Sequence, residues 1–104
     1  MGYYTHFNGT INLKDEKTAK IIKYVVEENA PPFDEIDMGE GLVTIDGLKV
    51  DFSGEGKYYD DEIKKFCYFI KSLDKEAEGE ITAEGEDNYD IWKIVLNKDG
   101  VEIL

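Results

Sequence analysis

An apolar stripe between residues 59 and 73 constrains the fold of this chain more than any other feature of its sequence. The members of the stripe recur at intervals of four, three, four and three residues: Tyr59, Ile63, Phe66, Ile70 and Leu73. Three carboxylates at residues 60–62 precede most of it and suit the positive end of a helix dipole. The pattern predicts an amphipathic helix, and such a helix must bury its apolar side against another element.

A second helix is predicted over about residues 16–29. Its apolar side chains share one side at three- and four-residue spacing: Ala19, Ile22, Val25 and Val26. Asp15 is placed to cap the first turn, and Pro31-Pro32 ends the helix because proline cannot continue helical geometry.

The remaining regular segments have strand patterns: residues 2–13, 42–45, 48–52, 79–86, 90–96 and 101–104. Imperfect alternation in the first segment suggests a bulge near Asn8-Gly9. Asp46-Gly47 favours a type I′ turn between the second and third segments. Residues 97–100 close the last pair, in which Trp92, Ile94 and Leu96 share one face.

These elements predict an α+β fold in which an antiparallel sheet of five to six strands carries two helices on one face. The order strand, helix, two strands, helix, strand is the βαββαβ core of ferredoxin-like folds, followed here by a C-terminal hairpin. With 104 residues and 41% apolar side chains, the chain has material for one core, so residues 1–104 are expected to form a single domain.

Charge is the most unusual property of the composition. The net charge is −12, and all of the excess lies in residues 31–104, which hold twenty acids against eight lysines. Arginine, the side chain best suited to phosphate and base recognition, is absent. Direct nucleic-acid binding is therefore not expected. The expected partner is a protein with a basic surface.

Compartment and assembly follow from further absences. The sequence shows no export signal and no apolar run near the ~18 residues of a membrane span, so no membrane association is expected. The single Cys67 cannot form an internal disulfide, which favours the cytoplasm of a bacterial host cell. The state expected in solution is a monomer or a weak homodimer.

Catalytic and metal-ligating patterns are not found. Cys67 lies beside the apolar stripe and His6 has no patterned partner, so neither is expected to be catalytic. The acids of residues 34–37 and 86–90 do not meet the spacing of an EF-hand loop. We expect no enzyme activity, no dedicated metal site and no cofactor.

The acids themselves suggest a binding surface. Residues 74–90 contain eight acids and one lysine, and residues 31–41 form a long loop that carries four more acids. Strand periodicity directs Glu80, Glu84 and Glu86 to one solvent face. The candidate partner-binding residues are Asp34, Glu35, Asp37, Glu40, Glu78, Glu80, Glu84, Glu86, Asp87 and Tyr89. An equally weighted interpretation is that these acids only keep the domain soluble.

The two ends of the chain resemble a loose group of short bacterial and phage proteins. The resemblance is carried by Met1-Gly2-Tyr3-Tyr4 with Gly9, and by residues 85–94, Gly-Glu-Asp-Asn-Tyr-Asp-Ile-Trp-Lys-Ile, followed by Asp99-Gly100. In size and charge the chain is also similar to acidic phage inhibitors of bacterial defence, including anti-CRISPR proteins. The group has no agreed activity, so the resemblance implies no functional residues.

The leading hypothesis is therefore an acidic phage or mobile-element inhibitor that resembles a nucleic-acid backbone and occupies a basic site on a nucleic-acid-handling complex. Two alternatives remain from other classes. One is a domain that binds a small ligand or a divalent metal ion. The other is a structural subunit of a homo-oligomer.

Overall fold

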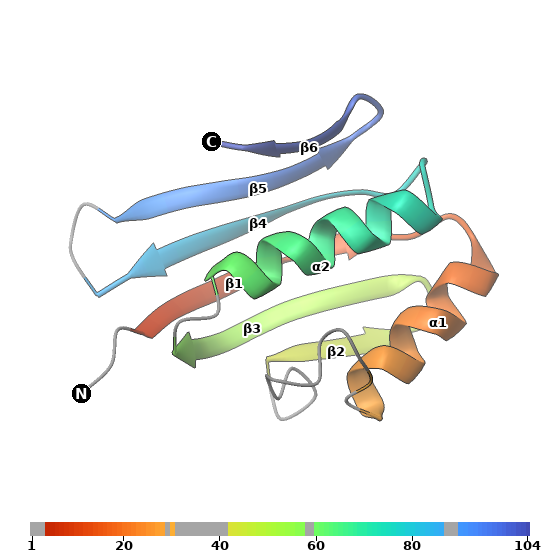
Figure 1. Cartoon of the computed structure of the whole chain (residues 1–104), viewed down its shortest axis with the longest axis horizontal. Helices are drawn as coiled ribbons and strands as arrows, with labels where there is room; N and C mark the ends of the chain where they lie inside the picture. Colours follow the sequence, from red (N-terminus) through yellow and green to blue (C-terminus); the bar gives the residue numbers. More distant parts are fainter. Residues whose placement is uncertain (1–3, 29, 31–41, 58–59, 87–89) are drawn as a thin grey trace.

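The computed structural model describes residues 4–28, 30, 42–57, 60–86 and 90–104 (Figure 1). Along the chain, these residues form β1 (Tyr4–Asn12), α1 (Glu16–Glu27), β2 (Val43–Asp46), β3 (Lys49–Lys57), α2 (Asp60–Leu73), β4 (Glu78–Gly85), β5 (Ile91–Asn97) and β6 (Gly100–Ile103). This order confirms the predicted βαββαβ core with an additional C-terminal hairpin.

All of the strands pair antiparallel in one six-stranded sheet of order β2-β3-β1-β4-β5-β6. Both helices lie on the same side of this sheet (Figure 1). The fold is therefore α+β in two layers, as predicted. Strands β2 and β6 form the two edges, and β1 lies near the centre of the sheet between β3 and β4.

Asp15 caps α1 as its position predicted. Its carboxylate accepts hydrogen bonds from the backbone N–H of Lys17 at 3.2 Å and from the hydroxyl of Thr18 at 3.0 Å. These bonds satisfy donors that an uncapped first turn would leave without partners. The helix then runs to Glu27 and ends at Glu28, before the two prolines.

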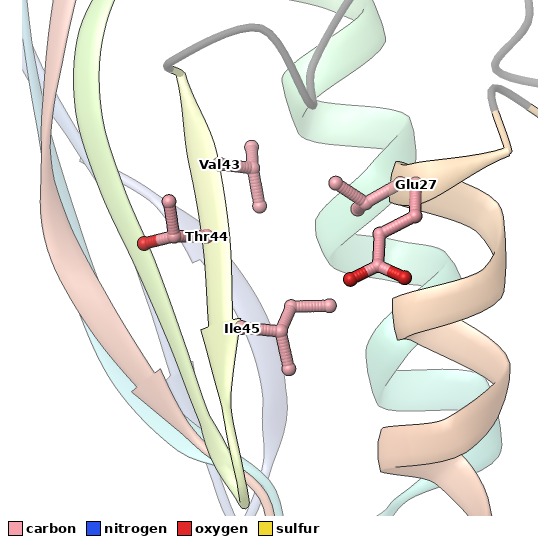
Figure 2. A pocket seen from close by; sticks show the side chains of 5 residues that line it. Glu27, Val43, Thr44 and Ile45 are labelled. Atoms are coloured by element: carbon pink, nitrogen blue, oxygen red, sulfur yellow. The ribbon is translucent and has the colours of Figure 1, made fainter.

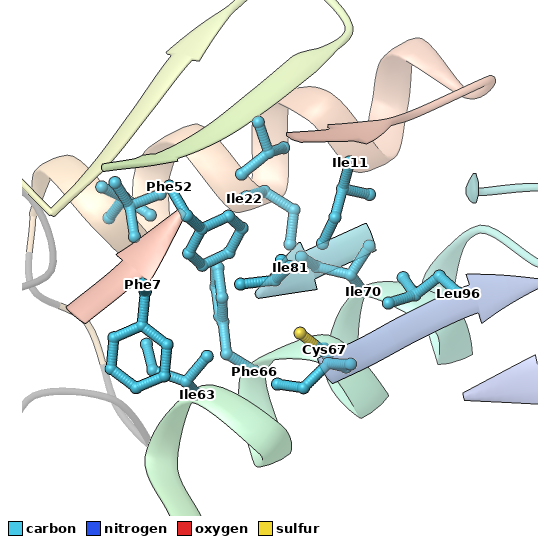
Figure 3. Close-up of a cluster of buried hydrophobic side chains, with 14 of the residues drawn as sticks. Phe7, Ile11, Ile22, Phe52, Ile63, Phe66, Cys67, Ile70, Ile81 and Leu96 are labelled. Carbon is cyan, nitrogen blue, oxygen red and sulfur yellow. The ribbon is translucent and has the colours of Figure 1, made fainter. Parts of the chain in front are cut away.

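The core lies between the helices and the covered side of the sheet (Figure 3). Three members of the stripe predicted on α2 contribute to its helical side, since Ile63, Phe66 and Ile70 are fully buried. Leu73 at the end of the stripe is exposed, and Tyr59 lies outside the described residues. The largest fully buried side chains that the sheet contributes to the core are Phe7, Ile11, Phe52, Ile81, Ile94 and Leu96. The rings of Phe52 and Phe66 meet edge to face, with centroids 6.1 Å apart.

The C-terminal hairpin is joined to this core through Trp92 on β5. Its ring meets Phe7 edge to face at a centroid distance of 6.2 Å. The ammonium of Lys64 on α2 lies 4.6 Å from the centroid of the same ring, within the range of a cation–π contact. The added strands therefore extend the core sheet and do not form a separate unit.

The bulge predicted near Asn8-Gly9 is wrong. The pairing of β1 with β3 and with β4 continues without a skipped residue from Thr5 to Asn12. Glycine is needed at position 9 for another reason: a Cβ there would collide with the backbone of β4, 2.7 Å from the Cα of Ile81. The irregular pattern thus marks a close approach of two backbones.

The turn between β2 and β3 lies one residue later than predicted. Asp46 pairs with Lys49, so Gly47 and Leu48 form the turn. Gly47 has a φ of 62°, the left-handed geometry that favours glycine. The carbonyl of Leu48 accepts a hydrogen bond from the backbone N–H of Leu13 at 2.7 Å, which continues the β1–β3 pairing by one residue into the turn.

Candidate functional site

The side of the sheet that faces away from the helices is uncovered, and we call its side chains the open face. Residues directly opposite each other in neighbouring antiparallel strands point to the same side. The pairings therefore place these charged side chains together on the open face: Asp46, Lys49, Asp51, Glu55, Glu78, Glu80, Glu84, Lys93 and Glu102. Carboxylates outnumber lysines in this set.

The carboxylates of the open face form two files. One follows β4 through Glu78, Glu80 and Glu84, and the other follows β3 through Asp51 and Glu55. Glu78 and Glu80 are two residues apart, which separates them by about 6.7 Å along the strand. The pairs Glu80–Glu84 and Asp51–Glu55 are four residues apart, about 13 Å, and neighbouring strands are separated by about 4.8 Å. Because β1 runs between β3 and β4, the two files lie about 10 Å apart.

The strip between the files carries small polar and neutral side chains of β1. Asn8, Thr10 and Asn12 alternate with the buried side chains of the same strand. The hydroxyl of Thr10 donates a 2.7 Å hydrogen bond to the carboxylate of Asp51, which orients that carboxylate. The centre of the open face is therefore polar. The β4 side carries the carboxylates of Glu78, Glu80 and Glu84, and the β3 side carries those of Asp51 and Glu55 together with Lys49.

Little of this charge is neutralised by neighbouring lysines. The Nζ of Lys93 lies 2.8 Å from Oε1 of Glu80, but about half of each side chain is exposed, and exposed pairs of this kind contribute little. Glu78 and Glu84 form no ion pair with any lysine in the described part of the chain. Glu80 and Glu84 lie on the same solvent-exposed side of the sheet, as predicted.

Glu86 lies just beyond the end of β4 and is also exposed. Its carboxylate accepts a 3.0 Å hydrogen bond from the backbone N–H of Tyr4, at the start of β1. It therefore has a structural contact in addition to its charge. The other predicted partner-binding residues lie outside the described residues: Asp34, Glu35, Asp37, Glu40, Asp87 and Tyr89.

His6 occupies the open face between two carboxylates. It lies opposite Glu55 of β3 on one side and opposite Glu84 of β4 on the other. Across residues 4–28, 30, 42–57, 60–86 and 90–104, no group of three His, Cys, Asp or Glu side chains has the geometry to hold a metal ion. The cross-strand row of His6 is thus a polar surface feature with no metal-binding geometry.

Cys67 lies within the core, where it is fully buried (Figure 3). Burial raises the pKa of its thiol to about 12, because the charged thiolate loses its hydration there. The thiolate is the reactive form of cysteine, so this side chain acts as a small apolar group.

Asp74 is a buried carboxylate that the sequence pattern did not single out. Its Oδ2 accepts hydrogen bonds from the backbone N–H groups of Lys14 at 2.6 Å and Asp15 at 3.0 Å, and its Oδ1 accepts one from Glu76 at 3.1 Å. The residue joins the turn before α1 to the turn after α2. Its position directly after a predicted helix, in a short polar connection, is the only sequence signal of this role.

The pKa of Asp74 reflects two opposing effects. Burial by itself raises it, because the charged form loses hydration. The three N–H donors and the nearby ammonium of Lys71 stabilise the carboxylate and outweigh burial, so the pKa lies below its ordinary value. Asp74 is therefore charged in the native protein and has a structural role.

Neither helix in the described part of the chain has both the length and the apolarity needed to cross a membrane. No protein-family model, no curated protein and no solved structure matches the chain. The candidate site therefore rests on its geometry alone.

Proposed function

We propose that this protein is a small acidic binding protein whose open face occupies a basic site on another protein. The partner class is a nucleic-acid-handling complex of bacterial defence, and the protein acts as a phage or mobile-element inhibitor that takes the place of a nucleic-acid backbone. No catalytic step is involved. The biological setting is part of this proposal and follows the expected resemblance of the two chain ends to short bacterial and phage proteins.

One observation carries this proposal. The carboxylates of Glu78, Glu80 and Glu84 stand on an uncovered sheet face, parallel to those of Asp51 and Glu55. A nucleic-acid backbone presents negative charges at regular intervals to a groove lined with lysine and arginine. Two parallel files of carboxylates on a rigid sheet offer such a groove a comparable pattern.

The charge also determines how such a complex would form. A surface dominated by one sign attracts an oppositely charged partner over distances of about one Debye length, about 8 Å at physiological salt. Association is then fast at low salt and slows as salt is added. If the carboxylates serve only solubility, binding to the partner should not depend on where in the sheet the substituted carboxylates lie.

The test compares two variants that carry the same change in net charge. The first reverses Glu80, Glu84 and Glu86 to Lys on or beside the open face. The control reverses Glu28, Glu76 and Asp99, which are exposed but lie at the end of α1 and in two turns. Fluorescence anisotropy measures how well each protein displaces a labelled DNA duplex from a purified RNA-guided nuclease or another nucleic-acid-handling defence complex.

We expect the wild-type protein and the control to displace the duplex, and the open-face variant to need a concentration about tenfold higher or more, equivalent to about 1.4 kcal/mol. Displacement by the wild type should weaken steeply with salt. If both triple variants lose activity equally, position on the open face is irrelevant and the proposal fails. Solubility would then be the remaining role of the charge.

A further inference from the structure

A cleft between α1 and β2 is smaller than the usual ligand pocket. Its volume is about 230 Å³, and it is lined by Val26, Glu27, Val43, Thr44 and Ile45 (Figure 2). Pockets for drug-sized molecules and cofactors occupy about 300–1,000 Å³. A recognition site of this protein is therefore expected on its exposed surface, of which the open face is a part.

Exposed aromatic and apolar side chains gather at one end of the open face. Ile91 of β5 is 60% exposed and Tyr4 of β1 is 45% exposed, and His6 is exposed as well. Alternation along β1 places Tyr4 and His6 on the same side of the sheet, and Ile91 is on that side because it lies opposite Glu84. Aromatic side chains are enriched in the centres of protein–protein interfaces.

These side chains adjoin two carboxylates in one cross-strand row. Across four neighbouring strands, the side chains that lie opposite one another are Glu55, His6, Glu84 and Ile91, and we call them the His6 row. All four are exposed. Because neighbouring strands are about 4.8 Å apart, the two carboxylate side chains begin about 10 Å apart, with His6 midway between them.

The two carboxylates of the His6 row are available to a cation from another molecule. Glu80 differs from them because it already contacts Lys93 at 2.8 Å, and Asp51 accepts a hydrogen bond from a neighbouring hydroxyl. Among the described side chains, no lysine pairs with Glu55 or Glu84. The row therefore combines negative charge without a counter-ion and exposed aromatic and apolar surface.

We propose that the His6 row binds an arginine side chain of the partner protein. The guanidinium lies over His6 and donates hydrogen bonds to Glu55 on one side and to Glu84 on the other. Tyr4 and Ile91 border the site and shield these bonds from water, as the contacts around an interface hot spot do. For its partner the inference rests on the proposed function, since the His6 row is part of the same open face.

The chemistry of the row favours arginine over other occupants. A guanidinium is planar, stacks on aromatic rings and has five N–H donors, whereas a lysine ammonium is a strongly hydrated point charge. Metal-binding geometry is absent from the described part of the chain. A second copy of the chain cannot supply the guanidinium, because the sequence contains no arginine.

The probe is a pair of pentapeptides with blocked ends and equal charge, Ala-Gly-Arg-Gly-Ala and Ala-Gly-Lys-Gly-Ala. Each is titrated into the isotope-labelled full chain at physiological salt, and NMR follows the backbone amides and the imidazole C–H groups of His6. We expect the largest shifts at Glu55, His6 and Glu84. The arginine peptide should bind about threefold more tightly than the lysine peptide, or better.

Two matched variants separate a specific pair from general attraction. Glu84→Gln and Glu78→Gln remove the same charge from the same strand, but the two positions are about 20 Å apart, well beyond the Debye length of about 8 Å. Glu84→Gln should weaken binding of the arginine peptide about three- to fivefold, and Glu78→Gln less than about 1.5-fold. His6→Ala should remove the preference for arginine over lysine. Equal losses in the two Gln variants, or equal binding of the two peptides by the wild type, would overturn the inference.

This inference and the proposed function fail in different ways. If displacement of the DNA duplex depends on the open face while the two peptides bind equally, the arginine site is wrong and the proposed function stands. If the peptides behave as expected while position on the open face has no effect on displacement, the proposed function is wrong and the arginine site serves contact with a different partner.

Discussion

The two faces of one sheet differ in almost every physical property. On β4, Ile81 and Ala83 are completely buried against the helices, whereas their neighbours Glu80 and Glu84 are exposed. The covered face is apolar and closely packed. The open face is polar except at Tyr4, Ile91 and Val95, and it carries most of its charge as carboxylates. Because successive residues alternate between these environments, the strand that supports the core also displays the candidate binding surface.

Because of this difference, substitutions on the two faces should affect different properties of the protein. Substitutions on the covered face should lower the free energy of unfolding and affect binding only through it. Substitutions on the open face should change binding with little effect on stability, because no packing is lost there. The two faces can therefore be tested with neighbouring residues of a single strand.

The largest effect is expected for Ile81→Ala on β4. It removes a fully buried side chain and leaves a cavity, which should lower the free energy of unfolding by about 2–5 kcal/mol. Glu80→Ala, one residue away on the open face, should change it by less than about 0.5 kcal/mol. Urea denaturation followed by circular dichroism measures both, and similar losses would contradict the contrast between the two faces.

A smaller but clear effect is expected for Gly9→Ala at the centre of the sheet. The added Cβ would collide with the carbonyl oxygen of Glu80 and lie 2.7 Å from the Cα of Ile81, and both contacts are backbone atoms that cannot rotate away. Overpacking of this kind costs about 1–3 kcal/mol. Asn8→Ala on the open face is the control, and a Gly9→Ala protein as stable as that control would show that the strands can separate.

Asp74→Asn should lower the free energy of unfolding by about 2 kcal/mol at neutral pH. An amide cannot accept all three backbone N–H bonds, and it carries no charge. The native pKa of Asp74 is depressed, so its contribution is present above the unfolded pKa, which is near 3.8, and disappears as pH falls through the native pKa. Denaturation curves across this acidic range should show wild type and variant converging. If the difference in unfolding free energy between wild type and Asp74→Asn stayed constant down to the lowest pH, the charged carboxylate would not be the cause of that difference.

The sequence predicted the parts of the structure that depend on local patterns. Helical spacing located α2 and its buried Ile63, Phe66 and Ile70, and Asp15 marked the start of α1. Two-residue periodicity placed Glu80 and Glu84 on one side of β4. Each of these features depends on residues a few positions apart, and there backbone geometry alone relates sequence to structure.

Contacts between distant residues decided the rest. Gly9 suggested a bulge because its local pattern does not show that the backbone of Ile81 passes beside it. His6 lies between Glu55 and Glu84 only because three separate strands pair side by side. Asp74 likewise holds together two turns that are distant in the sequence. The cleft between α1 and β2 has the same origin, because the space between two elements depends on how they pack and not on the pattern of either one.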